Sequence, residues 1–141
     1  MTPHALVVGA SGIVGSATSR LLADQGWQVT GLARNPKATE NITPLAADLL
    51  DPVALAAALE GLKPTHVYLT TWARQATEAE NIRVNAAMVR NLLTALPKGP
   101  RHVALVTGLK HYLGPFEAYG KGSLPQTPFR EEQGRLFSRK S

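Results

Sequence analysis

The chain of 141 residues contains no cysteine, and aromatic side chains make up only 6% of it. Without cysteine it has no disulfide, no thiolate metal site and no cysteine nucleophile. No apolar run approaches the ~20 residues that a membrane-spanning helix needs. The N-terminus also lacks a cationic stretch followed by a long apolar segment, the pattern of a signal peptide. These absences predict a cytoplasmic protein with no membrane partner.

A concentrated basic surface is also missing, although the formal net charge is +5 at pH 7. Lysine and arginine are scattered along the chain, and no basic stripe alternates with aromatic residues as in nucleic-acid-binding proteins. Part of the excess lies in the last residues, at Arg135, Arg139 and Lys140. The distribution favours an ordinary solvated surface, so we expect no nucleic-acid partner.

Short apolar segments alternate with helical patterns along most of the chain. Strands are expected over 5–8, 27–32, 42–46, 66–70 and 102–107, and helices over 13–24, 52–59 and 78–96. Strands joined by crossover helices are typical of a parallel sheet covered on both faces. The predicted fold class is α/β, a Rossmann-like doubly wound parallel sheet of order 3-2-1-4-5. We expect a nucleotide-binding domain over 1–115 and a loop-rich tail over 116–141.

The first apolar segment runs directly into three glycines, Gly9, Gly12 and Gly15, spaced G-x-x-G-x-x-G. In a dinucleotide-binding loop the first glycine makes a tight turn, the second admits the pyrophosphate and the third lets the helix approach its strand. The exposed N–H groups of the helix start then attract the pyrophosphate. The predicted cofactor contacts in this loop are Gly9, Ser11, Gly12, Ile13, Val14 and Gly15. The alternative is a strand–turn–helix corner without a ligand.

The second expected strand lacks the acid that an NAD site requires. Such a carboxylate binds the ribose 2′-hydroxyl about 20 residues past the glycines. Here the strand continues as Thr30-Gly31-Leu32-Ala33-Arg34-Asn35-Pro36. A guanidinium can bind a 2′-phosphate through two parallel charge-assisted hydrogen bonds. The pattern predicts that the ligand is NADP(H), with Arg34 binding its 2′-phosphate and Ser11 assisting. Otherwise Arg34 is a solvated loop arginine.

Two further polar positions, Asp48 and Asn85, leave two interpretations each. Asp48 precedes Leu49 and Leu50, so it either holds the adenine amino group while its neighbours pack on the ring, or caps its own loop. Asn85 either braces the site from the long helix or is an ordinary exposed residue. His4 opens a strand, as do His66 and His102, and we expect all three to be surface or edge residues.

The segment from Thr107 to Glu117, TGLKHYLGPFE, follows the last expected strand. Parallel sheets place ligands and chemistry at the carboxyl ends of their strands. A lysine at this point, Lys110, could hydrogen-bond the nicotinamide ribose and lower the pKa of a neighbouring phenol.

Together with the glycine loop, three segments resemble the extended short-chain dehydrogenase/reductases, in particular their progesterone 5β-reductase/iridoid synthase branch. The segments are Thr70-Thr71-Trp72, Asn85 with Met88-Val89-Arg90-Asn91-Leu92-Leu93, and Thr107–Glu117. The resemblance covers about residues 4–136. It implies NADPH as cofactor and a small enone or enal as substrate, reduced by hydride transfer to the β-carbon. The cofactor contacts it implies include Asp48, Leu49, Thr70, Thr71, Trp72, Thr107 and Lys110.

The resemblance also implies a tyrosine donor for the developing enolate oxygen, assisted by Lys110. In the family this tyrosine follows a segment like Thr127–Glu132, whereas the chain ends at Ser141 before reaching such a position. We therefore expect a cofactor-binding portion that stops before the later strands and the substrate lobe. Tyr112 either replaces the missing acid or packs near the cofactor. The alternative function is a non-catalytic dinucleotide-binding module or an inactive fragment.

The expected strand over 102–107 is strongly apolar. With no later strand beside it, it forms an exposed sheet edge, which invites pairing with another chain. The sequence thus predicts self-association through this edge.

Overall fold

The structure is a computed structural model that describes residues 1–96, 99–108 and 128–133. Eight elements follow one another along the chain. They are β1 (His4–Val8), α1 (Ile13–Asp24), β2 (Gln28–Ala33), β3 (Thr43–Ala46), α2 (Pro52–Leu59), β4 (His66–Leu69), α3 (Glu78–Ala95) and β5 (His102–Leu105).

The five strands form one parallel sheet of order β3-β2-β1-β4-β5. This confirms the expected fold class and strand order. The last strand is shorter than expected, because β5 ends at Leu105 and its pairing with β4 stops there. Val106 N–H still donates to the carbonyl of Leu69 at 2.9 Å, one step beyond the strand.

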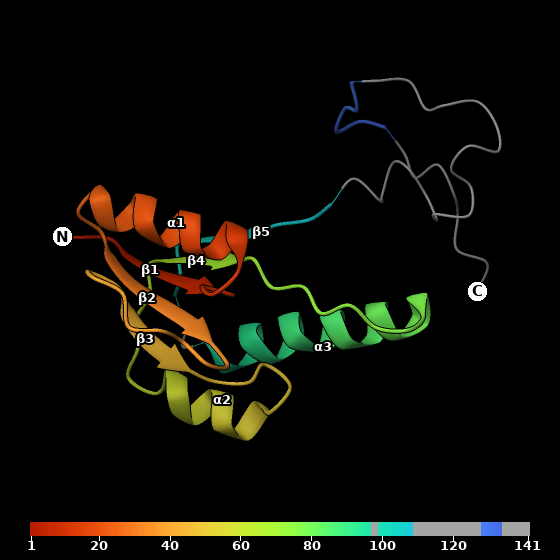
Figure 1. Ribbon diagram of the computed structural model, residues 1–141, viewed down its shortest axis with the longest axis horizontal. Helices are drawn as coiled ribbons and strands as arrows, with labels where there is room; N and C mark the ends of the chain where they lie inside the picture. The colour runs from red at the N-terminus through yellow and green to blue at the C-terminus, as the bar shows by residue number, and fades with distance from the viewer. Residues whose placement is uncertain (97–98, 109–127, 134–141) are drawn as a thin grey trace. The chain divides into compact units, whose positions relative to one another are not determined.

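Helices cover both faces of the sheet, with α1 on one and α2 and α3 on the other (Figure 1). The alternation along β1 shows how the sequence specifies this arrangement. Ala5 and Val7 belong to the core cluster under α1, whereas Leu6 and Val8 belong to the cluster under α2 and α3. All four are fully buried, so a strand apolar at every position reflects a sheet covered on both sides.

The three helices begin in different ways. Asp51 caps α2 by accepting a hydrogen bond from Ala54 N–H, and Pro52 occupies the first turn. Thr77 caps α3 by accepting from Glu80 N–H, and two acidic residues lie in that first turn. At α1 the N-cap is Gly12, which has no side chain to accept a bond, and its first turn contains no acid.

Polar side chains at the amino end of the sheet form hydrogen bonds with one another and with the backbone. His4 is only 8% exposed, and its Nε2 lies 2.8 Å from the hydroxyl of Thr30. The Thr65 hydroxyl also bonds to the backbone of His4. The expectation of a surface or edge residue is therefore wrong for His4, because β1 is central in the sheet and the His4 side chain packs against Thr30 on the same face as Leu6 and Val8. Burial lowers the pKa of His4.

The chain divides into two compact units, Met1–Val106 and Thr107–Ser141. The first contains the whole sheet. In the second, Arg130 and Gln133 close a short turn, in which Gln133 N–H donates to the carbonyl of Arg130 at 3.1 Å. The predicted domain boundary between 115 and 116 falls outside the described residues. Within the described ranges, no helix is long and apolar enough to cross a membrane.

Candidate functional site

A cleft of about 550 Å³ opens at the carboxyl ends of β1, β2 and β4. Sixteen residues line it: Gly9, Ser11, Gly12, Leu32, Ala33, Arg34, Asn35, Ala47, Asp48, Leu49, Leu50, Thr70, Thr71, Trp72, Ala73 and Met88. Nine of the predicted cofactor contacts are among them: Gly9, Ser11, Gly12, Arg34, Asp48, Leu49, Thr70, Thr71 and Trp72. They come from four separate stretches of the sequence.

The glycine loop is held tightly at its first and last glycines. Gly9 has φ +89°, a conformation that residues with a side chain rarely adopt. A Cβ on Gly15 would collide with the carbonyl oxygen of Gly9 and lie 2.8 Å from the hydroxyl of Thr70. Thr70 secures the same loop, because its hydroxyl donates to the carbonyl of Val8 at 2.8 Å. The loop thus requires glycine at both positions for reasons internal to the chain.

Gly12 differs, because the protein itself does not require it. Its φ of −80° suits any residue. A Cβ there would meet only the carbonyl oxygen of Gly9, at an ordinary contact distance of 3.4 Å. The position faces the cleft at the start of α1, where the first N–H groups of a helix have no carbonyl of the same helix to bond. The cleft therefore contains an uncapped helix start with free space in front of it.

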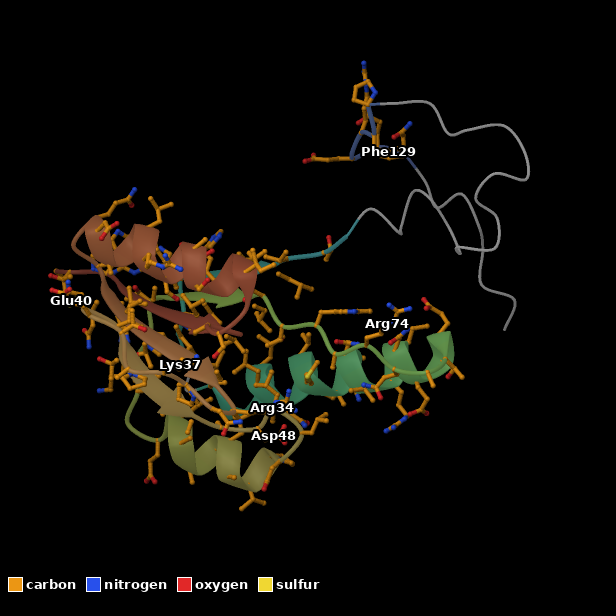
Figure 2. All side chains as sticks on the ribbon, in the orientation of Figure 1. Arg34, Lys37, Glu40, Asp48, Arg74 and Phe129 are labelled. Carbon is orange, nitrogen blue, oxygen red and sulfur yellow. The ribbon has the colours of Figure 1, made fainter. Side chains whose placement is uncertain are left out.

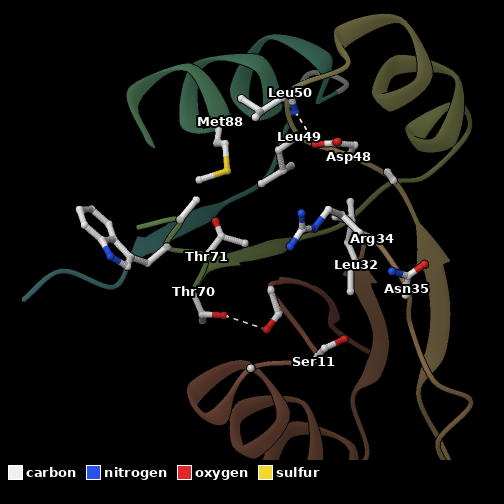
Figure 3. A pocket seen from close by; sticks show the side chains of 16 residues that line it. Ser11, Leu32, Arg34, Asn35, Asp48, Leu49, Leu50, Thr70, Thr71 and Met88 are labelled. Carbon is white, nitrogen blue, oxygen red and sulfur yellow. Dashed lines mark hydrogen bonds between the residues drawn. The ribbon is translucent and has the colours of Figure 1, made fainter. Parts of the chain in front are cut away.

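Arg34 reaches the cleft from the end of β2. Figure 3 shows its guanidinium directed into the cleft, with Leu32 beside it on the same strand end. The side chain is exposed and takes part in no ion pair among the described residues. A cation placed in this way is available to a negatively charged ligand.

Asp48 lies across the cleft near Arg34 (Figures 2 and 3). Its Oδ1 accepts a hydrogen bond from Leu50 N–H at 2.9 Å, so it caps its own loop. The same loop is tied to α3, since the Asn91 side-chain amide donates to the carbonyl of Leu49 at 2.8 Å. Leu49 is buried, whereas Leu50 is 48% exposed. Loop capping by Asp48 is confirmed, and a role toward adenine remains compatible with its place in the cleft.

The remaining wall follows β4. Thr71, Trp72 and Ala73 continue from that strand along the cleft, and Trp72 is 66% exposed. Asn85 on α3 fixes this wall, because its side chain accepts from Ala73 N–H and donates to the Ala73 carbonyl, both at 2.9 Å. The interpretation of Asn85 as a brace is confirmed over that of an ordinary exposed residue.

Several predicted contacts lie elsewhere. Ile13 and Val14 form the first turn of α1 and are exposed, while Gly15 is buried beneath the loop. Thr107 lies in the second compact unit, so its cofactor role stays a prediction. Lys110 and Tyr112 lie outside the described residues, as does the rest of the Thr107–Glu117 motif beyond Gly108. Among the residues that the structure describes, no cluster of histidine and acidic side chains is suited to hold a metal ion.

Sequence reasoning missed some lining residues. Asn35 and Ala47 are neighbours of predicted contacts, and extending those predictions by one residue would have found them. Met88 gives no such signal, because its helical spacing indicates a core residue, and only the packing of α3 brings it to the cleft.

Comparison with known proteins gives a consistent result. A family model described as the NAD dependent epimerase/dehydratase family matches residues 5–136. An (S)-8-oxocitronellyl enol synthase from Camptotheca acuminata is 38% identical over 94% of this chain and 37% of its own length. A 3-oxo-Δ(4,5)-steroid 5-β-reductase from Arabidopsis thaliana is 39% identical over 94% of this chain and 37% of its own. The resemblance found in the motifs is confirmed, and the chain spans less than two fifths of these relatives.

A solved structure supports the same placement. A short-chain dehydrogenase/reductase superfamily protein from Agrobacterium tumefaciens, crystallised with bound NAD, has a TM-score of 0.65 and 27% sequence identity. The match covers 77% of this chain and 34% of that one.

Proposed function

Because the chain belongs to the NAD dependent epimerase/dehydratase family, we propose that its cleft binds NADP(H) for a reductase of activated C=C bonds. The observation that carries this proposal is that an uncapped helix start and Arg34 share one cleft. The helix start offers N–H donors to a pyrophosphate, and the guanidinium offers a positive charge to a further phosphate.

The cleft suits a dinucleotide in size and lining. Its volume of about 550 Å³ lies within the range of small-molecule and cofactor sites. Leu32, Leu49 and Met88 supply apolar surface for a flat adenine ring. Asp48 has already used Oδ1 for its own loop, and its second oxygen remains for the adenine amino group. Thr70 acts indirectly, since its hydroxyl holds the glycine loop.

Preference for the phosphorylated cofactor is proposed from Arg34. We expect the chain to bind NADP⁺ about tenfold more tightly than NAD⁺, since charge-assisted hydrogen bonds contribute about 1.5–3 kcal/mol. Isothermal titration of both dinucleotides against the chain and its Arg34→Ala variant measures this preference. Arg101→Ala, an exposed arginine before β5, is the control. Equal affinities that do not respond to Arg34→Ala would refute the role of Arg34.

The reaction is proposed from the relatives, two of which are named as an enol synthase and a steroid 5-β-reductase. When bound, NADPH would supply a hydride to the β-carbon of an enone or enal. The carbonyl oxygen then becomes an enolate and needs a positioned proton donor. Lys110 is proposed to assist this donor by lowering the pKa of a phenol. Tyr112 is the tyrosine of the same motif.

NADPH consumption with a simple activated enone tests the reaction. We expect turnover that falls at least a hundredfold in Lys110→Ala, the usual range for a lost acid–base group. Lys63→Ala, an exposed lysine outside the cleft, is the matched control. Unchanged turnover in Lys110→Ala would remove the proposed role of Lys110.

A second candidate function is dinucleotide binding without turnover. It is favoured by the composition of the cleft wall, whose described lining contains neither a tyrosine nor a lysine. Tight NADP⁺ binding by a chain that does not consume NADPH with any activated enone would support this module. Turnover that depends on Lys110 would exclude it.

Self-association through β5 is a further part of the proposal. Val103, Leu105 and Val106 are 43–52% exposed at the end of the sheet order. An apolar edge of this kind favours pairing with a second copy. Sedimentation equilibrium should show oligomers that decrease in a Val103→Lys, Leu105→Lys variant. A wild-type chain that stays monomeric at high concentration would contradict this.

A further inference from the structure

Helix α3 holds two walls of the cleft that come from distant parts of the sequence. On the wall that follows β4, Asn85 forms hydrogen bonds with both backbone groups of Ala73. On the wall that follows β3, the side-chain amide of Asn91 donates to the carbonyl of Leu49 at 2.8 Å, across 42 positions of sequence. Leu49 lines the cleft and Asn91 does not, so any effect of Asn91 on a ligand passes through the loop that it holds.

The loop between β3 and α2 takes its shape from two hydrogen bonds of its own. Leu50 N–H donates to Oδ1 of Asp48 at 2.9 Å, and Asp51 N–H donates to the carbonyl of Asp48 at 3.1 Å. Both bonds lie within the loop, so they fix its curvature and not its distance from the rest of the cleft. The bond from Asn91 reaches the middle of the loop from outside and fixes it against α3.

Burial makes the loop sensitive to the loss of this bond. Leu49 is only 5% exposed, so its carbonyl has little access to water. A buried acceptor that loses its donor pays the full cost of its desolvation, and the loop can avoid that cost only by moving outward until water reaches the carbonyl. Such a movement would carry Asp48 and Leu50 with it, and both of them line the cleft.

Two kinds of contact toward a base come from this loop. Figure 3 shows Asp48 and Leu49 along the same side of the cleft, where Leu49 offers apolar surface and Asp48 a carboxylate oxygen. A hydrogen bond weakens steeply with distance and angle, whereas apolar contact is not directional. A displaced loop would therefore lose the contact of Asp48 with an amino group before it loses the contact of Leu49 with the ring.

We propose that Asn91 is a positioning residue for the base of the dinucleotide. By holding the carbonyl of Leu49, it keeps Asp48 at the place where its free oxygen accepts a hydrogen bond from the adenine amino group. This inference rests on the proposed function, since it requires a dinucleotide in the cleft. It assigns part of the selectivity for the base to a side chain outside the cleft, whereas Asn85 supports the wall after β4 and does not affect that selectivity.

The test compares NADP⁺ with its hypoxanthine analogue, in which a carbonyl replaces the adenine amino group. Isothermal titration measures both ligands against the wild-type chain, Asn91→Leu and Asn91→Ala, and the melting temperature checks the fold of each variant. Leucine has the same branched shape as asparagine but cannot donate, so Asn91→Leu removes the hydrogen bond and keeps a side chain in its place. Asn85→Leu is the matched change for the other wall, and Thr94→Ala, exposed on the same helix, is the control.

The wild-type chain is expected to bind NADP⁺ about fivefold more tightly than the hypoxanthine analogue. In both Asn91 variants this ratio should fall to about one, through loss of NADP⁺ affinity. Asn85→Leu should weaken both ligands and keep the ratio, and Thr94→Ala should behave as wild type. Asp48→Ala should abolish the ratio by itself, and adding Asn91→Leu should then change it no further, because residues that act through one another are not additive.

The outcomes separate this inference from the proposed function. A ratio that stays at the wild-type value in both Asn91 variants overturns the positioning role and keeps NADP(H) binding. Equal loss of affinity for the two ligands also overturns it, because Asn91 then supports the cleft as a whole. A wild-type chain that binds both ligands equally well overturns the inference alone, and one that binds no dinucleotide overturns the proposed function as well.

Discussion

The two ends of the sheet differ in whether their polar groups have hydrogen-bond or ionic partners within the protein. At the amino end, His4, Thr30 and Thr65 bond to one another and to the backbone. At the carboxyl end, Arg34 and the first turn of α1 face a cleft without partners among the described residues. Since buried polar groups are normally paired, this contrast supports placing the proposed ligand at the carboxyl end.

The carboxyl end itself contains a finer contrast. All three helices start there, yet α2 and α3 have side-chain caps and α1 does not. A side-chain cap typically stabilises a helix by about 1 kcal/mol. Helix α1 lacks this stabilisation at the end that borders the cleft. A side chain at this position would occupy the space in which we propose that the pyrophosphate binds.

The largest effect is expected from Gly15→Val, because at Gly15 helix α1 packs closely against the glycine loop at the carboxyl end of the sheet. The new side chain would collide with the Gly9 carbonyl and the Thr70 hydroxyl. Overpacking of this kind costs about 3 kcal/mol or more, a large part of the stability of a small domain. Urea denaturation should show a strongly lowered midpoint. A midpoint near that of wild type would contradict the close approach of α1 to its loop.

Gly12→Asp gives α1 the cap that it lacks and so removes the contrast between the helices. Stability should change by only a few tenths of a kcal/mol, because glycine is already a tolerated N-cap. Dinucleotide affinity should fall at least tenfold, since the carboxylate takes the N–H groups and repels the pyrophosphate. Titration calorimetry and denaturation on the same variant separate the two effects. Unchanged affinity would exclude the helix start as the pyrophosphate site.

Asp51→Ala is the reverse change on a helix that already has its cap. Loss of the bond to Ala54 N–H should lower the free energy of unfolding by about 1 kcal/mol. Cofactor affinity should be unaffected, because Asp51 does not line the cleft. Selective loss of affinity would show that α2 contributes to the site more than its geometry indicates.

The smallest effect concerns the closed end and depends on pH. Burial lowers the pKa of His4 below its usual 6.5, so the unfolded chain takes up this proton at a higher pH than the folded chain. The stability that neutral His4 contributes is fully present above about pH 6.5, and it is lost as the pH falls toward the pKa of His4 in the folded state. Denaturation between pH 7.5 and pH 5 should show falling stability, with a smaller decline in His4→Gln. An equal decline of stability in the wild type and in His4→Gln would show that other titratable groups cause it.

Local signals anticipated much of this molecule. Glycine spacing, the Asp51-Pro52 start of a helix and apolar strands at regular intervals predicted the elements and their order. They worked because turns, caps and strand burial depend on neighbours in the chain. The same signals were wrong for His4, whose burial depends on β1 lying between β2 and β4 in the sheet and on its contact with Thr30.

The sequence by itself determined the glycine loop, the absence of an acid at the end of β2 and the fold class, because each is written in contiguous residues. Only the tertiary structure decided which side chains meet. Parallel pairing brings the ends of β1, β2 and β4 together, and the packing of α3 adds Met88 and the brace from Asn85. It also places Arg20 and Lys37 around one pocket. The sequence does not show that Arg20 and Lys37 line the same pocket, because their proximity depends on how α1 packs against β2.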